Sequence, residues 1–356
     1  MSGLEPWTGG RLCVVMMSAL GDAVHVLPLL DAVKTHAPST HVTWVLQPGP
    51  ALMARGHPNV DDTVIFRRSE GVRAYVDLRR QLATRRFDLL LDLQVYFKAG
   101  IVTLLADAGV KLGFDFARSR DLNCLFTTHR IPPHANQHVQ DQYLEFLDAI
   151  GVPHAELRWH LGPTPEERAR ARGLLAAADG PLVGIVVASS RRERNWHADR
   201  YAEVVAALRR DLGARSVLLG GVSAPETEMA TGILGRAEER PLDTMGQDLR
   251  TMLGLLDSCD VVIAPDTGPL HMCVAMGVPV VALYGFTNPR RSGPYRRFAE
   301  LLIDAHSDPG DGPSITTSYR KGRMQRITVA QVVERTALAL TRYAPAPPWR
   351  RDRPPA

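Results

Sequence analysis

The sequence predicts an α/β protein made of two Rossmann-like domains, each built on a doubly wound parallel sheet. The 356 residues are enough for two hydrophobic cores of about 150 to 180 residues each. Short apolar runs alternate with segments of helical spacing, which is the pattern of βαβ units. This alternation begins at Arg11 and starts again at Pro181, so the chain divides into two similar halves.

In the first half, an apolar run at 11–17 has the length of a strand, and a loop at 18–22 leads into a helix at 23–36. That helix is expected to bury one face, formed by Val24, Leu27, Leu30 and Val33. Further strands are predicted at 41–46, 63–66 and 87–93. Three consecutive leucines at 89–91 indicate a strand that is buried on both faces, as in a parallel sheet.

The second half repeats this order. We expect strands at 181–187, 216–219, 260–264 and 278–284, with a helix at 202–212 and another that begins near Pro269. The domain boundaries follow from this pattern. The first domain is assigned to residues 1–160, a helical linker to 161–180, the second domain to 181–335, and a helix end with a solvated Pro- and Arg-rich tail to 336–356.

Composition narrows the class of protein. The chain is 45% hydrophobic with a net charge of +4, which fits an anionic ligand or an anionic membrane surface, and nothing indicates a nucleic-acid partner. We expect no secretory signal, because residues 1–10 do not combine a basic segment with an apolar run, and no apolar run is long enough to span a bilayer. Cys13, Cys259 and Cys273 are expected as buried free thiols. We therefore expect a cytoplasmic protein whose membrane contact, if it makes any, is peripheral.

The strongest motif is the segment Val261–His271, in which a buried strand runs into Asp266, Thr267 and Gly268 before a helix begins. Backbone amides and the helix dipole at such a helix start favour a phosphate or pyrophosphate. Gly268 lets the phosphate approach the backbone, and His271 adds a donor. The alternative is a capping Asp266 or Thr267 with a histidine on the surface.

The matching turn of the first half is Ser18–Asp22. A carboxylate at Asp22 can act as a general base that takes a proton from an acceptor hydroxyl. The alternative is a carboxylate that caps the following helix. The turn holds no G-x-G-x-x-G fingerprint and no P-loop, which argues against a nicotinamide enzyme and against a nucleoside triphosphatase.

A third loop, Ser189–Trp196, follows the first strand of the second half and carries two serines and three arginines. These groups can bind a diphosphate and stabilise the negative charge that develops when it departs. The alternative is a solvated basic loop. No Asp-x-Asp motif or His/Cys cluster stands out, and Asp61-Asp62 is interpreted as a turn, so we expect no required metal.

In this order along the chain, the motifs resemble those of glycosyltransferase family nine, the lipopolysaccharide heptosyltransferases. The resemblance covers about residues 11 to 335. It is carried by the segments at 18–28, 92–98, 113–120, 136–138, 189–196, 264–271 and 284–289. It implies a GT-B fold with two domains that face a central cleft, the acceptor domain first and the donor domain second. It also implies an ADP-heptose donor, inversion at the anomeric carbon, no cofactor, and an anionic glycolipid acceptor that contains Kdo.

The family's functional residues are carried over position by position. Asp22 matches the proposed base, and Arg194 stands where the family has a lysine, which keeps the charge but replaces a compact ammonium by a planar fork. The implied donor-binding residues are Ser189, Ser190, Glu226, Met245, Asp266, Thr267, Gly268 and His271. The implied acceptor-binding residues are Ser18, Gly21, Arg67, Arg68 and Arg120.

Two other hypotheses stay open. A relative with the same chemistry could transfer heptose or hexose to a protein or to a small aminoglycoside-like acceptor. The other hypothesis is a non-enzymatic binding module or a relative of the epimerases. The presence of both Asp22 and the Asp266 loop argues against it. One stretch of the first half carries seven arginines, and we expect it to contact the inner face of the inner membrane. The alternative is a helix face that is simply exposed to solvent. The seven arginines are Arg67, Arg68, Arg73, Arg79, Arg80, Arg85 and Arg86.

Overall fold

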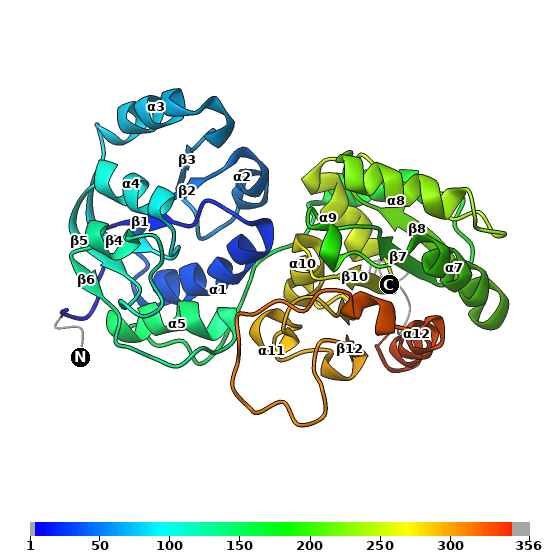
Figure 1. Cartoon of the computed structure of the whole chain (residues 1–356). Helices are drawn as coiled ribbons and strands as arrows, with labels where there is room; N and C mark the ends of the chain where they lie inside the picture. Colours follow the sequence, from blue (N-terminus) through cyan, green and yellow to red (C-terminus); the bar gives the residue numbers. More distant parts are fainter. Residues whose placement is uncertain (1–3, 344–356) are drawn as a thin grey trace. The chain divides into compact units, whose positions relative to one another are not determined.

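A computed structural model describes residues 4–343 of the chain (Figure 1). The chain divides into two compact units, Met1–His160 and Leu161–Ala356. Each unit holds a six-stranded sheet whose neighbouring strands all pair in parallel. Helices flank both sheets, so the predicted α/β fold with two Rossmann-like domains is confirmed.

The first sheet has the strand order β3-β2-β1-β4-β5-β6. Its strands are β1 (Arg11–Val15), β2 (His41–Leu46), β3 (Asp62–Ile65), β4 (Arg86–Asp92), β5 (Asp107–Gly113) and β6 (His129–Arg130). Its helices are α1 (Leu20–His36), α2 (Pro48–Ala54), α3 (Val72–Leu82), α4 (Phe97–Leu105) and α5 (Val139–Ala149), with short 3₁₀ turns η1 (Arg68–Glu70) and η2 (Asn123–Phe126).

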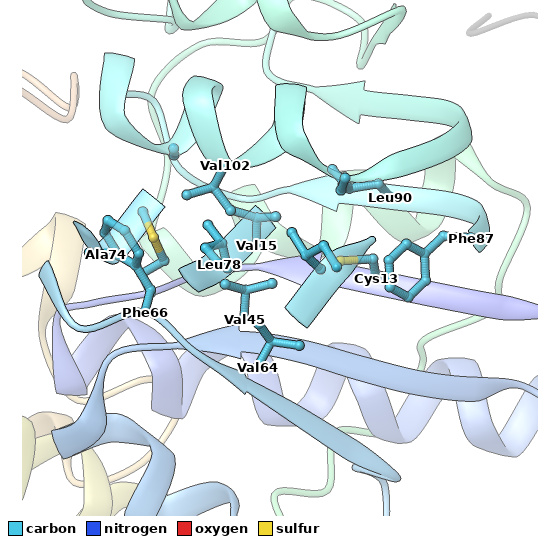
Figure 2. Packing of buried hydrophobic residues seen from close by; sticks show 14 residues of the cluster. Cys13, Val15, Val45, Val64, Phe66, Ala74, Leu78, Phe87, Leu90 and Val102 are labelled. Carbon is cyan, nitrogen blue, oxygen red and sulfur yellow. The ribbon is translucent and has the colours of Figure 1, made fainter. Parts of the chain in front are cut away.

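The core on one face of this sheet lies beneath α3 and α4 (Figure 2). Ala74 and Leu78 of α3 and Val102 of α4 pack there against strand residues such as Val15 and Leu90, all of them nearly inaccessible. Helix α1 lies on the opposite face and packs against α5 (Figure 1). Because α1 is enclosed between the sheet, α5 and α2, it is buried on all sides from residue 23 to 33. The predicted apolar face of Val24, Leu27, Leu30 and Val33 is therefore buried, and the burial extends to the other sides of the helix.

The second sheet has the order β12-β11-β10-β7-β8-β9. Its strands are β7 (Leu182–Val186), β8 (Arg215–Leu219), β9 (Leu242–Asp243), β10 (Val261–Pro265), β11 (Val280–Tyr284) and β12 (Leu302–Asp304). Numbered within its own unit from β7, the order becomes 3-2-1-4-5-6, the same as in the first unit. Each strand of one unit thus has a counterpart in the other.

The helices of the second unit also have counterparts. They are α6 (Pro165–Leu174), α7 (Ala198–Leu212), α8 (Ala224–Leu234), α9 (Leu249–Ser258), α10 (Gly268–Met276), α11 (Pro289–Ser292) and α12 (Val329–Tyr343), with turns η3 (Arg192–Arg194), η4 (Ala299–Leu301) and η5 (Arg323–Arg326). By position between strands, α9 corresponds to α3 and α10 to α4. Helix α12 packs on α7 as α5 packs on α1.

The segment expected as a linker, 161–180, contains α6, which begins with a capping box between Thr164 and Glu167. This helix packs closely against α9. Arg250 of α9 pairs with Glu167 at 2.6 Å and Arg168 pairs with Asp257 at 2.8 Å. The segment is therefore an integral layer of the second unit, because ion pairs and packing fix it there. Of the predicted C-terminal tail, residues 344–356 lie outside the described residues.

Two helices start earlier than expected: α1 begins at Leu20 and α7 at Ala198. The prediction for three thiols is confirmed, since Cys13, Cys259 and Cys273 are buried and free. Burial raises the pKa of each of these thiols. In the part of the chain that the structure describes, no helix combines the length and apolar character needed to cross a bilayer.

Candidate active site

The two strongest predicted motifs meet at one place in the second sheet. The loop 187–195 follows β7 and Asp266 follows β10, and these two strands are neighbours. The connections that leave β7 and β10 run to opposite sides of the sheet, and ligands of doubly wound sheets bind at such a switch point. Arg194 bridges the two loops, because its Nη1 lies 3.3 Å from the carbonyl oxygen of Asp266 and 3.3 Å from its Oδ2.

Asp266 is the centre of this bridge and is only 5% exposed. The hydroxyl of Thr287 donates to its Oδ2 at 2.6 Å, and the hydroxyl of Tyr284 lies 3.4 Å from its Oδ1. His271 Nε2 lies 3.5 Å from the same Oδ1. Burial alone would raise the pKa of Asp266, but the hydrogen bonds from His271 and Thr287 and the charge of Arg194 bring that pKa below its ordinary value. The carboxylate is therefore ionised and holds Arg194 and His271 in place.

The structure at the start of α10 bears on both interpretations of this motif, the ligand site and the capped helix. Thr267 is the N-cap residue, yet its side chain makes no capping hydrogen bond. Its Oγ1 is buried and finds no hydrogen-bond partner among the described residues. His271 is buried as well, so it is not a surface histidine. A buried hydroxyl without a partner costs about 1 to 3 kcal/mol, and at the positive end of a helix it is typical of a ligand site.

The loop after β7 is organised by Ser189 and Asn195. Asn195 Oδ1 accepts from Ser189 N at 2.7 Å, and the hydroxyl of Ser189 accepts from Arg191 N at 3.1 Å. Ser189 is buried and serves the loop itself, whereas Ser190 is exposed. Of the predicted serine pair, Ser189 is therefore engaged within the loop, and Ser190 is open to solvent.

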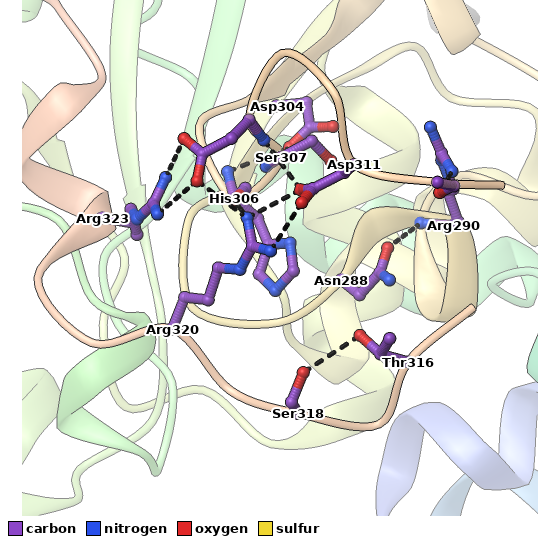
Figure 3. Close-up of polar contacts among 12 residues, drawn as sticks. Asn288, Arg290, Asp304, His306, Ser307, Asp311, Thr316, Ser318, Arg320 and Arg323 are labelled. Carbon is purple, nitrogen blue, oxygen red and sulfur yellow. Dashed lines mark hydrogen bonds and ion pairs between the residues drawn. The ribbon is translucent and has the colours of Figure 1, made fainter. Parts of the chain in front are cut away.

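A long segment after β12, residues 305–322, is tied to the same edge of the second sheet. Arg320 Nη1 donates to Asp311 Oδ2 at 2.7 Å (Figure 3). Arg323 Nη2 donates to Asp308 Oδ2 at 2.6 Å. The ring of Tyr319 stacks on that of Phe286, 4.8 Å between centroids, and the guanidinium of Arg191 lies 5.0 Å from the Tyr319 ring. The segment thus joins the loops that follow β11 and β7.

Glu226 and Met245 lie together at the carboxyl end of β8, beside the loop of Ser189. Glu226 Oε1 accepts from Gly221 N at 2.7 Å and thereby supports the start of α8. A Cβ on Gly220 would lie 2.7 Å from Met245 Cε, so the thioether covers this glycine closely. An apolar thioether beside a carboxylate suits a nucleoside, whose base is flat and whose ribose carries hydroxyls.

In the first unit, Asp22 occupies the third position of α1, and its Oδ2 accepts from Ala19 N at 3.1 Å. The capping interaction considered as an alternative therefore exists, and it fixes the carboxylate at the carboxyl end of β1. Gln94, from the loop after β4, holds the same turn: its Oε1 accepts from Met17 N at 3.2 Å and its Nε2 donates to Ser18 O at 2.7 Å. Gly21 lies beside Asp22 and is half-buried.

The predicted acceptor arginines are not brought together. Arg67 and Arg68 are exposed after β3, and Arg120 is exposed after β5. Four strand spacings separate β3 from β5, which is about 19 Å. Two residues of the seven-arginine stretch are ion-paired, Arg80 with Asp77 and Arg85 with Asp62.

The remaining carboxylates of interest have structural roles. Asp61 accepts from Lys34 Nζ at 2.6 Å and from Val42 N at 2.7 Å, as befits a turn before β3. Over residues 4–343, no three His, Cys, Asp or Glu side chains gather as a metal site would require.

Comparison with known proteins agrees with this architecture. The profile of glycosyltransferase family 9 (heptosyltransferase) matches residues 75–310, and the chain belongs to this family of enzymes. A curated relative, the lipopolysaccharide core heptosyltransferase OpsX of Haemophilus influenzae, is 30% identical over 82% of this chain and 83% of its own length. The predicted family membership and glycosyltransferase activity are confirmed.

Solved structures show the same fold. The glycosyl transferase family 9 protein of Veillonella parvula superposes with a TM-score of 0.80 at 24% identity, covering 93% of this chain and 97% of that one. The E. coli heptosyltransferase WaaC with ADP gives 0.71 at 22% identity, covering 92% and 99%. The two-domain GT-B fold is therefore shared with heptosyltransferases.

Several site residues were not singled out from the sequence. Thr287 and Tyr284 hold Asp266, Asn195 holds the Ser189 loop, and Gln94 holds the Ser18 turn. Tyr284 ends β11 and Thr287 follows it, and both reach Asp266 because β11 lies beside β10, which the sequence alone does not reveal.

Proposed function

We propose that the protein transfers heptose from ADP-heptose to a Kdo-containing acceptor of the lipopolysaccharide inner core, with inversion and without a metal or cofactor. The observation that carries this proposal is the arrangement at β7 and β10. There the ionised carboxylate of Asp266 holds Arg194 and His271 at the start of α10, and the unpartnered hydroxyl of Thr267 lies beside them. This is a site for the diphosphate of a donor.

The reaction is a single displacement at the anomeric carbon. The acceptor oxygen forms a bond to that carbon while the bond from the carbon to the diphosphate oxygen breaks, which inverts the configuration. Asp22 takes the proton of the acceptor hydroxyl. The departing ADP gains negative charge, which Arg194 and the amides at the start of α10 stabilise.

Donor identity rests on two supports. The E. coli relative was solved with ADP, and Glu226 with Met245 supplies a carboxylate and an apolar surface beside the diphosphate loop. For the acceptor, OpsX is named as a lipopolysaccharide core enzyme. The exposed Arg67, Arg68 and Arg120 favour an anionic acceptor over a cationic aminoglycoside, which would call for acidic side chains. We place the enzyme in the cytoplasm, at the inner face of the inner membrane.

The test is transfer by the purified chain with ADP-heptose beside UDP- and GDP-sugars. The acceptors are Kdo-lipid A and its deacylated, water-soluble form, and EDTA is present. We expect transfer from ADP-heptose alone, unaffected by EDTA. Binding of ADP-heptose with no transfer to either Kdo acceptor would reject the acceptor and leave the second candidate, transfer to a protein or small molecule. Loss of activity in EDTA that Mg²⁺ restores would reject the metal-independent mechanism.

A further inference from the structure

Exposed apolar side chains are unevenly divided between the two units. Among the described residues, eight of the exposed large hydrophobic side chains lie between residues 72 and 125, and three lie in the second unit. The first group is Val72, Val76, Tyr96, Phe97, Leu104, Phe116, Leu122 and Leu125, and the second is Leu174, Val222 and Tyr319. Among the described residues, the first unit therefore exposes more large apolar side chains than the second.

Six residues of the first group lie in segments that follow the carboxyl ends of β3, β4 and β5. We call these six the apolar rim: Val72, Tyr96, Phe97, Phe116, Leu122 and Leu125. The segments are in mutual contact, since α4 packs against both α3 and η2, and the Phe97 ring meets that of Phe126 at 5.5 Å. The rim residues thus lie in neighbouring segments at the carboxyl edge of the first sheet, the edge at which α1 and Asp22 follow β1.

Basic side chains are interleaved with the apolar rim. Exposed Arg67, Arg68, Arg73, Lys98 and Arg120 lie in the same segments. The guanidinium of Arg130 lies 4.2 Å from the ring of Phe116. The exposed acidic residues there are Glu70 and Asp121, so the segments carry a positive surplus. Apolar side chains ringed by cations are typical of a protein that lies on an anionic bilayer.

The internal duplication supplies a control for this interpretation. Helix α9, the counterpart of α3, is covered by α6, and a Cβ on Gly254 would lie 2.7 Å from the Glu167 carbonyl. Phe286, which follows β11 as Phe116 follows β5, is 3% exposed because Tyr319 stacks on it, whereas Phe116 is 68% exposed. The described part of the chain thus covers these positions in the second unit and leaves them exposed in the first.

We propose that the apolar rim docks onto an anionic lipid bilayer and brings Asp22 to the level of a membrane-bound acceptor. This deepens the proposed function, since it rests on a lipid-linked acceptor. A bilayer is the fitting occupant because a second copy of the same face would bring arginine against arginine across a symmetric interface. Apolar contact supplies the insertion and the basic side chains supply the preference for anionic headgroups.

Vesicle co-sedimentation tests the proposal, with phosphatidylglycerol-containing vesicles beside purely phosphatidylcholine vesicles. The test variant is Phe116→Ser/Leu122→Asn/Leu125→Ser, in which Asn suits the positive φ of residue 122. The matched control, Leu104→Ser/Leu174→Ser, removes exposed apolar side chains outside the rim. A second variant, Arg73→Glu/Lys98→Glu, tests the charge without touching the predicted acceptor residues.

We expect the unmodified chain and the control to bind anionic vesicles. The triple variant and the Arg73→Glu/Lys98→Glu variant should each bind these vesicles at least about tenfold more weakly. The triple variant should keep its rate on the deacylated acceptor and lose it on Kdo-lipid A in vesicles. Failure of the unmodified chain to bind vesicles would overturn the docking, whatever its activity on the soluble acceptor. A triple variant that changes the oligomeric state instead of vesicle binding would assign the rim to a protein interface. Vesicle binding without any transfer would reject the proposed function and leave the docking surface standing.

Discussion

The two units share one strand order but treat the carboxyl edges of their sheets differently. In the second unit the loops after β7, β10 and β11 are joined by Arg194, Asp266 and Thr287 through buried contacts. In the first unit the turn after β1 is held by Gln94, while the segments after β3, β4 and β5 present exposed apolar and basic side chains. A duplicated fold has thus been specialised at its edges. One edge is ordered by buried polar contacts, and the other leaves apolar and basic side chains exposed.

The largest effect is expected at Asp22 in the first unit. Asp22→Asn keeps an oxygen that can accept from Ala19 N, so α1 remains capped. The amide cannot take a proton, and we expect turnover to fall by about 10² to 10⁴. Initial rates at saturating ADP-heptose measure this, and calorimetry with ADP should give unchanged binding. Near-normal turnover would remove Asp22 as the base and leave it a helix cap alone.

Arg194 is the corresponding test of the second unit. Arg194→Met removes the bridge to Asp266 and the charge opposite the departing diphosphate, and we expect kcat to fall about 10²-fold. Arg194→Lys restores a charge but not the planar fork, so it should recover only part of the rate. Single-turnover rates with both variants separate these effects. Equal rates in the Met and Lys variants would show that charge at this position does not assist departure of ADP.

The fold could be predicted because its strands are nearly continuous apolar runs, such as Val261–Pro265, which is buried at every position. Helix starts were less predictable. Helix α1 begins after Ala19, whose side chain cannot cap the helix. Instead, the carboxylate of Asp22 accepts a hydrogen bond from the backbone N–H of Ala19. The usual signal of Ser, Thr, Asp or Asn immediately before a helix is therefore missing.

The site was predictable where one motif contains both strand end and helix start, as at 261–271. It was not predictable where separate motifs meet only through sheet order. Thr287 reaches Asp266 because β11 lies beside β10, and Gln94 reaches Ser18 because β4 lies beside β1. Sequence spacing carries no record of such neighbours. Likewise, the arginines at 67–86 formed one group in the sequence, but two of them are ion-paired in the structure.

A third expected effect concerns the buried Asp92 at the end of β4. Burial raises the pKa of this carboxyl to about 6, against hydrogen bonds from Asn123, Thr103 and Gln94 N. In the unfolded chain this carboxyl has a pKa near 3.8, so its neutral form stabilises the native state fully below pH 3.8. That stabilisation is lost as the pH rises to about 6, where the buried carboxyl ionises. A difference of about two units amounts to about 3 kcal/mol of unfolding free energy.

Asp92→Asn should abolish that pH dependence, because the amide does not ionise. Urea unfolding from pH 4 to 7.5 measures it, with the exposed Asp107→Asn as the matched control. We expect the variant to gain stability relative to the unmodified chain as pH rises, and the control to follow the unmodified chain. Parallel curves for Asp92→Asn would mean that the carboxyl ionises alike in both states.

The smallest effect is expected at Thr287, which holds Asp266 without itself being a predicted ligand of the donor. Thr287→Val removes a donor to a buried carboxylate oxygen, at a cost of about 1 to 3 kcal/mol. Because Asp266 positions Arg194 and His271, we expect KM for ADP-heptose to rise about tenfold or more. Thr287→Ser keeps the hydroxyl, so its KM should stay close to that of the unmodified chain. If lost packing alone raised KM in the Val variant, the Ser variant would show a raised KM as well. If Ser and Val behave alike, the hydroxyl is not what positions the carboxylate. The order of the second unit's edge would then rest on Arg194 and Tyr284.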